Sequence, residues 1–117
     1  MAIQTITPVQ LVKNSATSNI VPSGGTAIVA ADTFRIKYPQ EGKLLLMFNN
    51  TFAGAKVFTV NPGSFPYSVQ GKLDVSLAQN DVKYLIVSTD RFVDNDGYVN
   101  ITFEAGTTGF VRAFYLP

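Results

Sequence analysis

Short runs of alternating apolar and polar residues make up most of the chain. The alternation is clean in residues 33–38, 73–77 and 98–103, and a period of two places successive side chains on opposite faces of a strand. Gly, Pro, Asn and Asp separate the runs about every ten residues, which is typical of strands joined by tight turns. Apolar residues do not recur at helical spacing over three turns, so we expect no long helix.

Two other segments, residues 43–49 and 83–88, are apolar in both alternating sets of positions. A continuous apolar run bounded by turns is typical of a strand covered on both sides. We interpret the first segment as such a central strand. The second is another two-faced strand, with Leu85 and Val87 on one face and Tyr84 and Ile86 on the other.

These patterns predict an all-β fold of eight or nine short strands, an antiparallel β-sandwich or small barrel of jelly-roll or immunoglobulin-like type. A length of 117 residues fits one domain, which we place at residues 26–117. Residues 1–25 are expected to form an extended N-terminal arm and loop. Pro8 cannot donate to a sheet, and residues 13–25 are rich in Ser, Thr, Asn and Gly.

The composition excludes much of enzyme chemistry. The chain has neither Cys nor His, which removes thiol nucleophiles, thiolate metal sites, Ser-His-Asp catalysis and most transition-metal sites. A hydrolase that works with carboxylates, or a calcium site with oxygen ligands, remains possible, but most enzyme chemistry does not.

Charge and hydropathy narrow the choice of partner. A net charge of +1, with only 15% charged residues, argues against binding to nucleic acid through phosphate contacts and against a polybasic membrane anchor. Near-zero charge and a mean hydropathy of +0.17 are a solubility risk for a free monomer. They suit a protein that ends up packed against another protein.

The densest acidic cluster, Asp90, Asp94 and Asp96 followed by Gly97, is the weak candidate for a metal site. Several carboxylate oxygens at close range suit calcium. The match to an EF-hand loop fails, because its first and last ligand positions would both be phenylalanine. The alternative, which we favour, is a corner in which Asp caps its own backbone and Gly97 supplies a positive φ.

Aromatic residues in predicted turns are candidates for partner contact. The chain has nine Phe and five Tyr. An aromatic residue in a turn or loop is less certain to be buried in the core than one in a strand. An exposed apolar cluster marks a contact surface, but a place in the core is an equally good interpretation. With the apolar residues of the arm, the contact candidates are Ile3, Ile6, Val9, Phe52, Phe65 and Tyr67.

Several segments resemble a family of small virion proteins. They are residues 42–46 (Gly-Lys-Leu-Leu-Leu), 49–51 (Asn-Asn-Thr), 56–60 (Lys-Val-Phe-Thr-Val), 96–103 (Asp-Gly-Tyr-Val-Asn-Ile-Thr-Phe) and 109–117 (Gly-Phe-Val-Arg-Ala-Phe-Tyr-Leu-Pro). Together with the start Met1 to Pro8, this order is similar to that of the capsid decoration, or cement, proteins of tailed bacteriophages. The resemblance covers most of the chain and includes no residue-specific site motif.

The resemblance implies a β-sandwich that docks on the outer surface of the mature capsid and stabilises its lattice. It implies a homotrimer, the phage major capsid protein as partner, no catalysis and no cofactor. Since the N-terminus lacks a basic segment followed by an apolar one, we expect no signal peptide. We expect synthesis in the cytoplasm of the bacterial host and a final location on the virion.

Two other functions remain open at this point. One is a β-sandwich module of a phage particle that binds carbohydrate or host, with Tyr67 and Tyr98 stacking on sugar and calcium at the acidic cluster. The other is a small hydrolase with two carboxylates flanking a glycosidic bond. The absence of Trp weakens both, since sugar sites commonly offer an aromatic platform.

Overall fold

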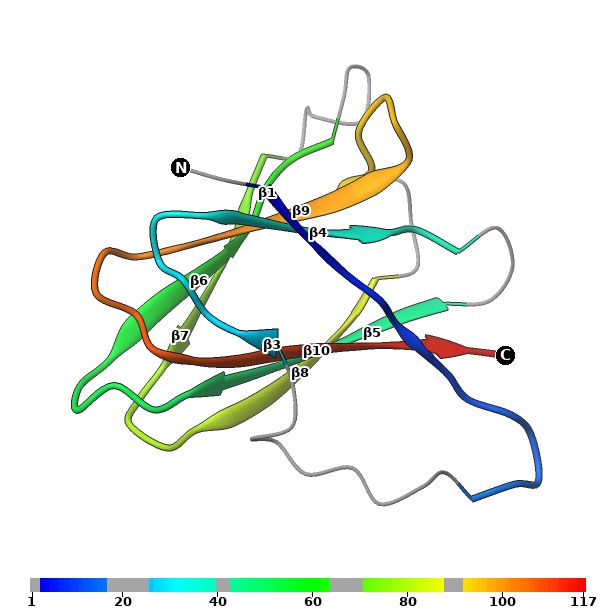
Figure 1. Ribbon diagram of the computed structural model, residues 1–117, viewed down its shortest axis with the longest axis horizontal. Helices are drawn as coiled ribbons and strands as arrows, with labels where there is room; N and C mark the ends of the chain where they lie inside the picture. The colour runs from blue at the N-terminus through cyan, green and yellow to red at the C-terminus, as the bar shows by residue number, and fades with distance from the viewer. Residues whose placement is uncertain (1–2, 17–25, 40–42, 64–70, 88–91) are drawn as a thin grey trace.

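Ten strands form the part of the chain that the computed structural model describes, which is residues 3–16, 26–39, 43–63, 71–87 and 92–117 (Figure 1). No helix occurs in these ranges that is long and apolar enough to cross a membrane. The strands are β1 (Ile3–Ile6), β2 (Val9–Gln10), β3 (Thr26–Ala27), β4 (Thr33–Lys37), β5 (Lys43–Asn50), β6 (Lys56–Val60), β7 (Leu73–Leu77), β8 (Val82–Val87), β9 (Tyr98–Phe103) and β10 (Gly109–Leu116).

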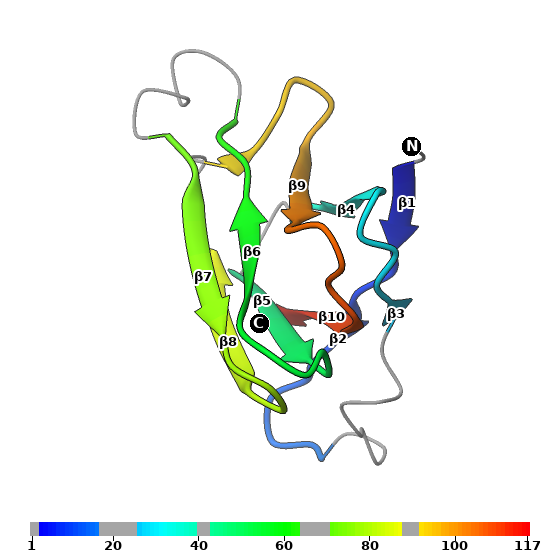
Figure 2. The same ribbon diagram turned by 90° about the vertical axis from the view of Figure 1, so that its left-hand side faces the viewer.

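The strands form two sheets that face each other. Sheet 1 has the order β1-β4-β9-β6-β7, and sheet 2 has the order β2-β10-β5-β8, with β3 also paired to β10. Viewed from the side, β7 and β8 lie at one margin of the two layers and β1 and β3 at the other (Figure 2). The predicted all-β sandwich is confirmed.

The last eight strands pair in a nested order, in which the first pairs with the last and the two middle strands pair with each other. β3 pairs with β10, β4 with β9, β5 with β8, and β6 with β7, all antiparallel. This nesting, divided between two sheets, is the arrangement of a jelly roll. Only β6 and β7 are joined as a hairpin within one sheet, so every other connection from β4 to β10 passes from one sheet to the other.

The N-terminal strands depart from the predicted arrangement. β1 pairs in parallel with β4, and β2 pairs in parallel with β10, so both sheets are mixed rather than purely antiparallel. Pro8 stands between them, where the chain leaves sheet 1 for sheet 2, and a residue without an N–H fits this break in pairing. Residues 3–10, expected in an arm, therefore take part in both sheets, and Ile6 is only 4% exposed.

The core lies between the sheets and follows the alternation of the sequence. Phe34 and Ile36 point inwards from β4 while Arg35 and Lys37 point outwards. Two rings, Phe34 and Phe58, meet Phe103 edge-on at centroid distances of 5.2 and 5.3 Å, the geometry that aromatic quadrupoles favour. β5, β6, β9 and β10 supply further core residues: Leu44, Leu46, Phe48, Val60, Val99, Ile101, Val111 and Ala113. Ile6, Leu77, Val87 and Phe92 complete the core from other parts of the chain.

A buried amide organises the end of the sandwich where β5 stops. Asn50 is fully buried, and its Nδ2 lies 2.9 Å from the carbonyl oxygen of Leu77 and 3.0 Å from that of Gly54. Its Oδ1 accepts a hydrogen bond from the Phe52 N–H. Burying an amide is tolerated when its hydrogen bonds are made, so Asn50 fixes the β5–β6 turn against the end of β7.

Candidate interaction surface

The outer faces of the two sheets differ in chemistry. Most of the residues that point outwards from sheet 1 are polar or charged: Thr5, Thr33, Arg35, Lys37, Thr59, Asn61, Asp74, Ser76, Asn100 and Thr102. The apolar exceptions are Ile3, which is 64% exposed on β1, and Val57 on β6, and the ring of Tyr98 also lies on this face. Such a face is stable in water without a covering partner.

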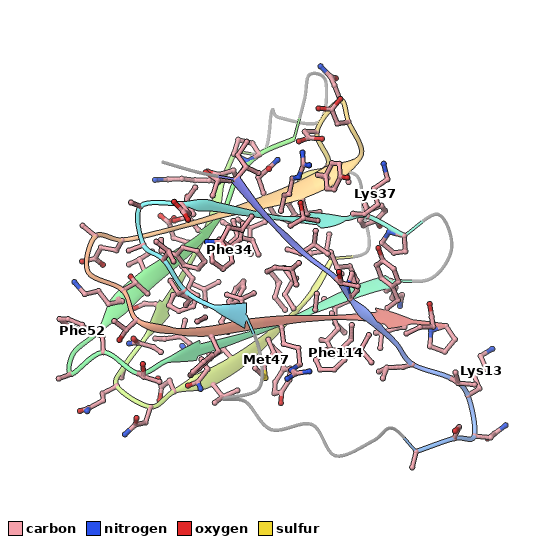
Figure 3. All side chains as sticks on the ribbon, viewed as in Figure 1. Lys13, Phe34, Lys37, Met47, Phe52 and Phe114 are labelled. Carbon is pink, nitrogen blue, oxygen red and sulfur yellow. The ribbon has the colours of Figure 1, made fainter. Side chains whose placement is uncertain are left out.

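Sheet 2 is apolar on its outer face as well as on its inner one. The strand register aligns Val9, Phe114, Leu45 and Ile86 in one row across four strands. A second row holds Arg112, Met47 and Tyr84, and a third holds Ala27, Phe110, Asn49 and Val82. Met47 and Phe114 lie on the side of β5 and β10 away from Phe34, which lies between the sheets (Figure 3).

Exposure on this outer face is concentrated on β8. Met47 and Phe114 are 2% and 7% exposed, and Leu45 is half-buried. On β8, by contrast, Val82, Tyr84 and Ile86 are 38%, 64% and 54% exposed. We call these three side chains the β8 surface. They alternate with Lys83, Leu85 and Val87, of which Leu85 and Val87 pack against the core.

The sequence of β8 is apolar on both faces, but within the described residues only its inner face packs against another sheet. The sequence correctly predicts β5 as a central strand, because it lies between β10 and β8. β8 has the same apolar composition but is the last strand of sheet 2. Contiguous exposed apolar side chains on a small domain mark a contact surface more often than a chance pattern.

One charged group lies within the apolar face. Arg112 stands opposite Met47 on β10, and its Nε is buried with no hydrogen-bond partner. A buried donor without an acceptor costs about 1–3 kcal/mol. An acceptor brought by a partner, a carbonyl or carboxylate oxygen, would remove that cost.

The acidic cluster is a backbone corner between residues 92 and 98, as we favoured from the sequence. The carboxylate of Asp94 accepts hydrogen bonds from Asp96 N–H and Tyr98 N–H, both at 2.9 Å, and from the Asn100 amide at 2.8 Å. Gly97 has φ +84°, which only glycine adopts easily.

These contacts set the pKa of Asp94. Burial raises the pKa of its carboxyl, but the hydrogen bonds from Tyr98, Asn100, Asp96 and Gly97 together outweigh burial and hold it below 3.8. With its oxygens occupied by the corner, Asp94 is a structural group. Asp90 lies outside the described residues, and within them no group of three or more acidic residues could hold a metal ion.

Tyr98, a candidate platform for sugar, is already covered on one face. The guanidinium of Arg35 lies 4.2 Å from the ring centroid and the ammonium of Lys37 lies 5.0 Å from it. Lys37 is itself held by the carbonyl oxygen of Asp96 at 2.8 Å. Cation–π contacts of this kind stabilise both partners, and they compete with a sugar for the ring of Tyr98.

The predicted contact residues do not form one surface. Ile3 is 64% exposed on β1, whereas Ile6 belongs to the core, so its proposed contact role is wrong. Val9 is half-buried beside Phe114 on the apolar face. Phe52 is 36% exposed in the β5–β6 turn, where the Lys56 ammonium lies 4.5 Å from its ring centroid.

Two of the candidates, Phe65 and Tyr67, lie outside the described residues. Val82, Tyr84 and Ile86 were not among the contact residues predicted from the sequence. Their signal was present, because residues 83–88 are apolar in both alternating sets of positions, and a sandwich of two sheets covers only one of the two faces of each strand. What the sequence lacks is the information that β8, rather than another strand, ends the sheet.

Comparison with known proteins adds no assignment. No protein-family model, no curated protein and no solved structure matches the chain.

Proposed function

We propose that this chain is a non-enzymatic structural protein of a phage particle, which docks on the outside of the capsid and stabilises the mature lattice. The observation that carries the proposal is the β8 surface, where Val82, Tyr84 and Ile86 are exposed beside the apolar outer face of sheet 2. The proposed partner is the phage major capsid protein. No nucleic acid, membrane, cofactor or small substrate takes part.

The outer faces of the two sheets support the proposal, because they suit different surroundings. The polar outer face of sheet 1 suits contact with water, and the apolar outer face of sheet 2 suits contact with protein. A jelly roll is a rigid support for such a surface and recurs in viral capsid and lectin domains. Fold alone does not establish function, whereas the difference in chemistry between the two outer faces is particular to this chain.

Stabilisation would work by linkage. A protein that binds the assembled lattice but not its free subunits shifts the equilibrium towards the lattice. Each copy bound to the closed shell adds to the stability of the lattice. The unpaired Nε of Arg112 indicates what the partner surface should offer within its apolar contact, namely an oxygen acceptor.

The homotrimer and the location on the virion are the parts of the proposal that derive from the resemblance to decoration proteins. The near-zero net charge agrees with a protein that works in an assembly.

Capsid binding tests the proposal directly. Expanded capsids of the phage that encodes the chain are incubated with purified protein and sedimented. We expect co-sedimentation of the unaltered protein, and at least a tenfold loss of affinity for the double variant Tyr84→Ser, Ile86→Ser. The matched control is Thr33→Ser on the polar outer face of sheet 1, which should bind normally. Equal binding of the double variant and the control would reject the β8 surface as the docking site.

A carbohydrate- or host-binding module is the second candidate. It draws on the same fold and on the row of Thr, Asn and Tyr side chains on sheet 1. It is the weaker candidate, because Arg35 and Lys37 cover one face of Tyr98. Failure to bind capsids, together with a rise in melting temperature on addition of a sugar, would favour this second function.

A further inference from the structure

The edge strands of the two sheets differ in how well they are protected against pairing with another chain. Natural sheets blunt their edge strands by short length, charge, proline or a covering segment. The edge strand β2 has two residues, with β3 following along the same side of β10, and β1 has four residues. β7 carries Asp74, which pairs with Lys72, and its Ser76 carbonyl is capped by Lys83 at 2.7 Å.

β8 shows none of these devices. It is six residues long, contains no proline and no acidic residue, and pairs with β5 in an uninterrupted register without a bulge. Its one charge, Lys83, is directed to the backbone of β7. In the described part of the chain β8 pairs with β5 on one side and with no strand on the other.

The register shows which backbone groups face outwards along this edge. The Asn50 N–H donates to the Asp81 carbonyl oxygen just beyond the β5–β8 ladder. Hydrogen-bonded pairs alternate in an antiparallel ladder, so Lys83 and Leu85 direct their N–H and C=O groups to β5. Those of Val82, Tyr84 and Ile86 point away from the sheet. The same residues carry the exposed apolar side chains.

We propose that β8 pairs edge to edge with β8 of a second copy of this chain. The two strands run antiparallel about a two-fold axis at Tyr84, so that sheet 2 continues into its partner. This inference concerns pairing along the free edge of β8, where the same three side chains make cross-strand contacts, whereas capsid docking concerns the outward surface of those side chains. Solution mass reports on the first and capsid co-sedimentation on the second.

The sequence of β8 is self-complementary in this register. Tyr84 faces Tyr84 of the second copy, and Val82 faces its Ile86, so each outward residue exchanges its backbone hydrogen bonds with an apolar partner. Aromatic and β-branched cross-strand pairs stabilise sheets. Lys83 faces Leu85 of the second copy. Shifting the two-fold axis to Lys83 would place two ammonium groups opposite each other, which is unfavourable.

A second copy suits this edge because the contact is isologous, with the same strand on both sides. The paired β8 surfaces would also form one continuous apolar strip across the two copies. A two-fold contact is independent of the three-fold association that the resemblance implies, and it can join two trimers as well as two monomers.

Solution mass, measured by light scattering over a wide range of concentrations, is the first test. We expect a concentration-dependent doubling of the mass. Tyr84→Pro should abolish it, because Pro removes an N–H that points away from β5 and leaves the β5–β8 ladder intact. Ile86→Lys is the second variant, in case the first fails to fold, and Ile3→Lys on β1 is the control that keeps the doubling.

Cross-linking tests the register. The chain has no cysteine, so one introduced thiol has only its copy to react with. In the proposed pairing the two Tyr84 Cα atoms lie about 5.5 Å apart, within the range of a disulfide. The two Val82 Cα atoms lie about 14 Å apart, from four residues of strand rise. Mild oxidation should therefore dimerise Tyr84→Cys and leave Val82→Cys monomeric.

Three results would overturn the inference. They are a mass that does not double at any concentration, a doubling that both Tyr84→Pro and Ile86→Lys retain, and equal cross-linking of the two cysteine variants. The capsid-binding assay is a separate readout, so self-association and docking can fail independently.

Discussion

The ammonium group of Lys83 on β8 donates a 2.7 Å hydrogen bond to the backbone carbonyl oxygen of Ser76 on β7. The bond joins the last strand of sheet 2 to the last strand of sheet 1 across the margin of the sandwich. It places a charge on the backbone of β7, where another chain could otherwise pair. The same bond directs that charge away from the free edge of β8.

Replacing Lys83 by Ala should lower the free energy of unfolding by about 0.5–1.5 kcal/mol, the value of one hydrogen bond. Urea denaturation of the two proteins measures the difference. The control is Lys13→Ala, since Lys13 is exposed, and it should change the midpoint little. An unchanged midpoint for Lys83→Ala would show that water replaces the bond without cost.

Gly109 at the start of β10 should tolerate no side chain. Its φ is +142°, and a Cβ placed on it would lie 1.9 Å from the Asn49 carbonyl oxygen. We expect Gly109→Ala to cost about 2 kcal/mol or more, from overpacking and backbone strain.

Gly54 is the matched control for this change. A Cβ there would meet the Phe52 ring at an ordinary 3.6 Å, so Gly54→Ala should be close to neutral. Thermal melts of both variants compare them. Similar melting temperatures would mean that β10 shifts to make room.

Asp94 should make the stability of the fold depend on acid pH. Because hydrogen bonds outweigh burial and lower its pKa in the folded state, the ionised carboxylate stabilises the fold above the unfolded pKa of about 3.9. That contribution is lost as pH falls through the lower, folded-state pKa.

The variant Asp94→Ala should therefore be less stable than the unaltered protein at pH 7, by about 1–2 kcal/mol. The difference should shrink as pH falls below about 4. Melting temperatures over a pH series measure it. A difference that is constant with pH would mean that the charge of Asp94 has no part in the corner.

The phenol of Tyr115 should affect stability at the opposite end of the pH scale. Its hydroxyl donates to the Lys37 carbonyl oxygen and so ties β10 to β4. Burial, with a smaller effect of Tyr98, raises its pKa above 10.0. The stabilisation is present below the unfolded pKa and is lost as pH rises through the raised folded-state value.

Tyr115→Phe removes both the hydrogen bond and the titration. We expect a loss of about 0.5–1.5 kcal/mol at pH 7 and a flatter stability profile above pH 10 than that of the unaltered protein. Urea midpoints measured from pH 8 to pH 11 give the comparison. Parallel profiles for the two proteins would contradict the proposed role.

The alternation of apolar residues was enough to predict the sandwich, because a strand with one buried face records that face at every second position. Phe34 and Ile36 show this on β4, and Val99 and Ile101 show it on β9. The pattern carries no information on which strands are neighbours. β5 and β8 have the same two-faced composition, and only the tertiary pairing makes one central and the other an edge.

The N-terminal strands show a second limit. β1 and β2 have few residues and are separated by Pro8, so local pattern predicts an arm. They are held by parallel pairing to strands distant in the sequence, β4 and β10. A local pattern cannot anticipate such pairing. Of the candidate contact residues, Ile6 illustrates the consequence, because that pairing carries its side chain into the core.

The nested pairing of the eight strands from β3 through β10 has a consequence for the kinetics of folding. The hairpin of β6 and β7 closes the shortest loop and carries the smallest entropic cost. Each further pair encloses a longer stretch of chain, so assembly is expected to proceed from the middle of the sequence outwards and slowly. During synthesis on the ribosome, β5 can pair with β8 first, and its second neighbour, β10, is made only at the end of the chain. Sheet 2 is completed only after Leu116 has been synthesised.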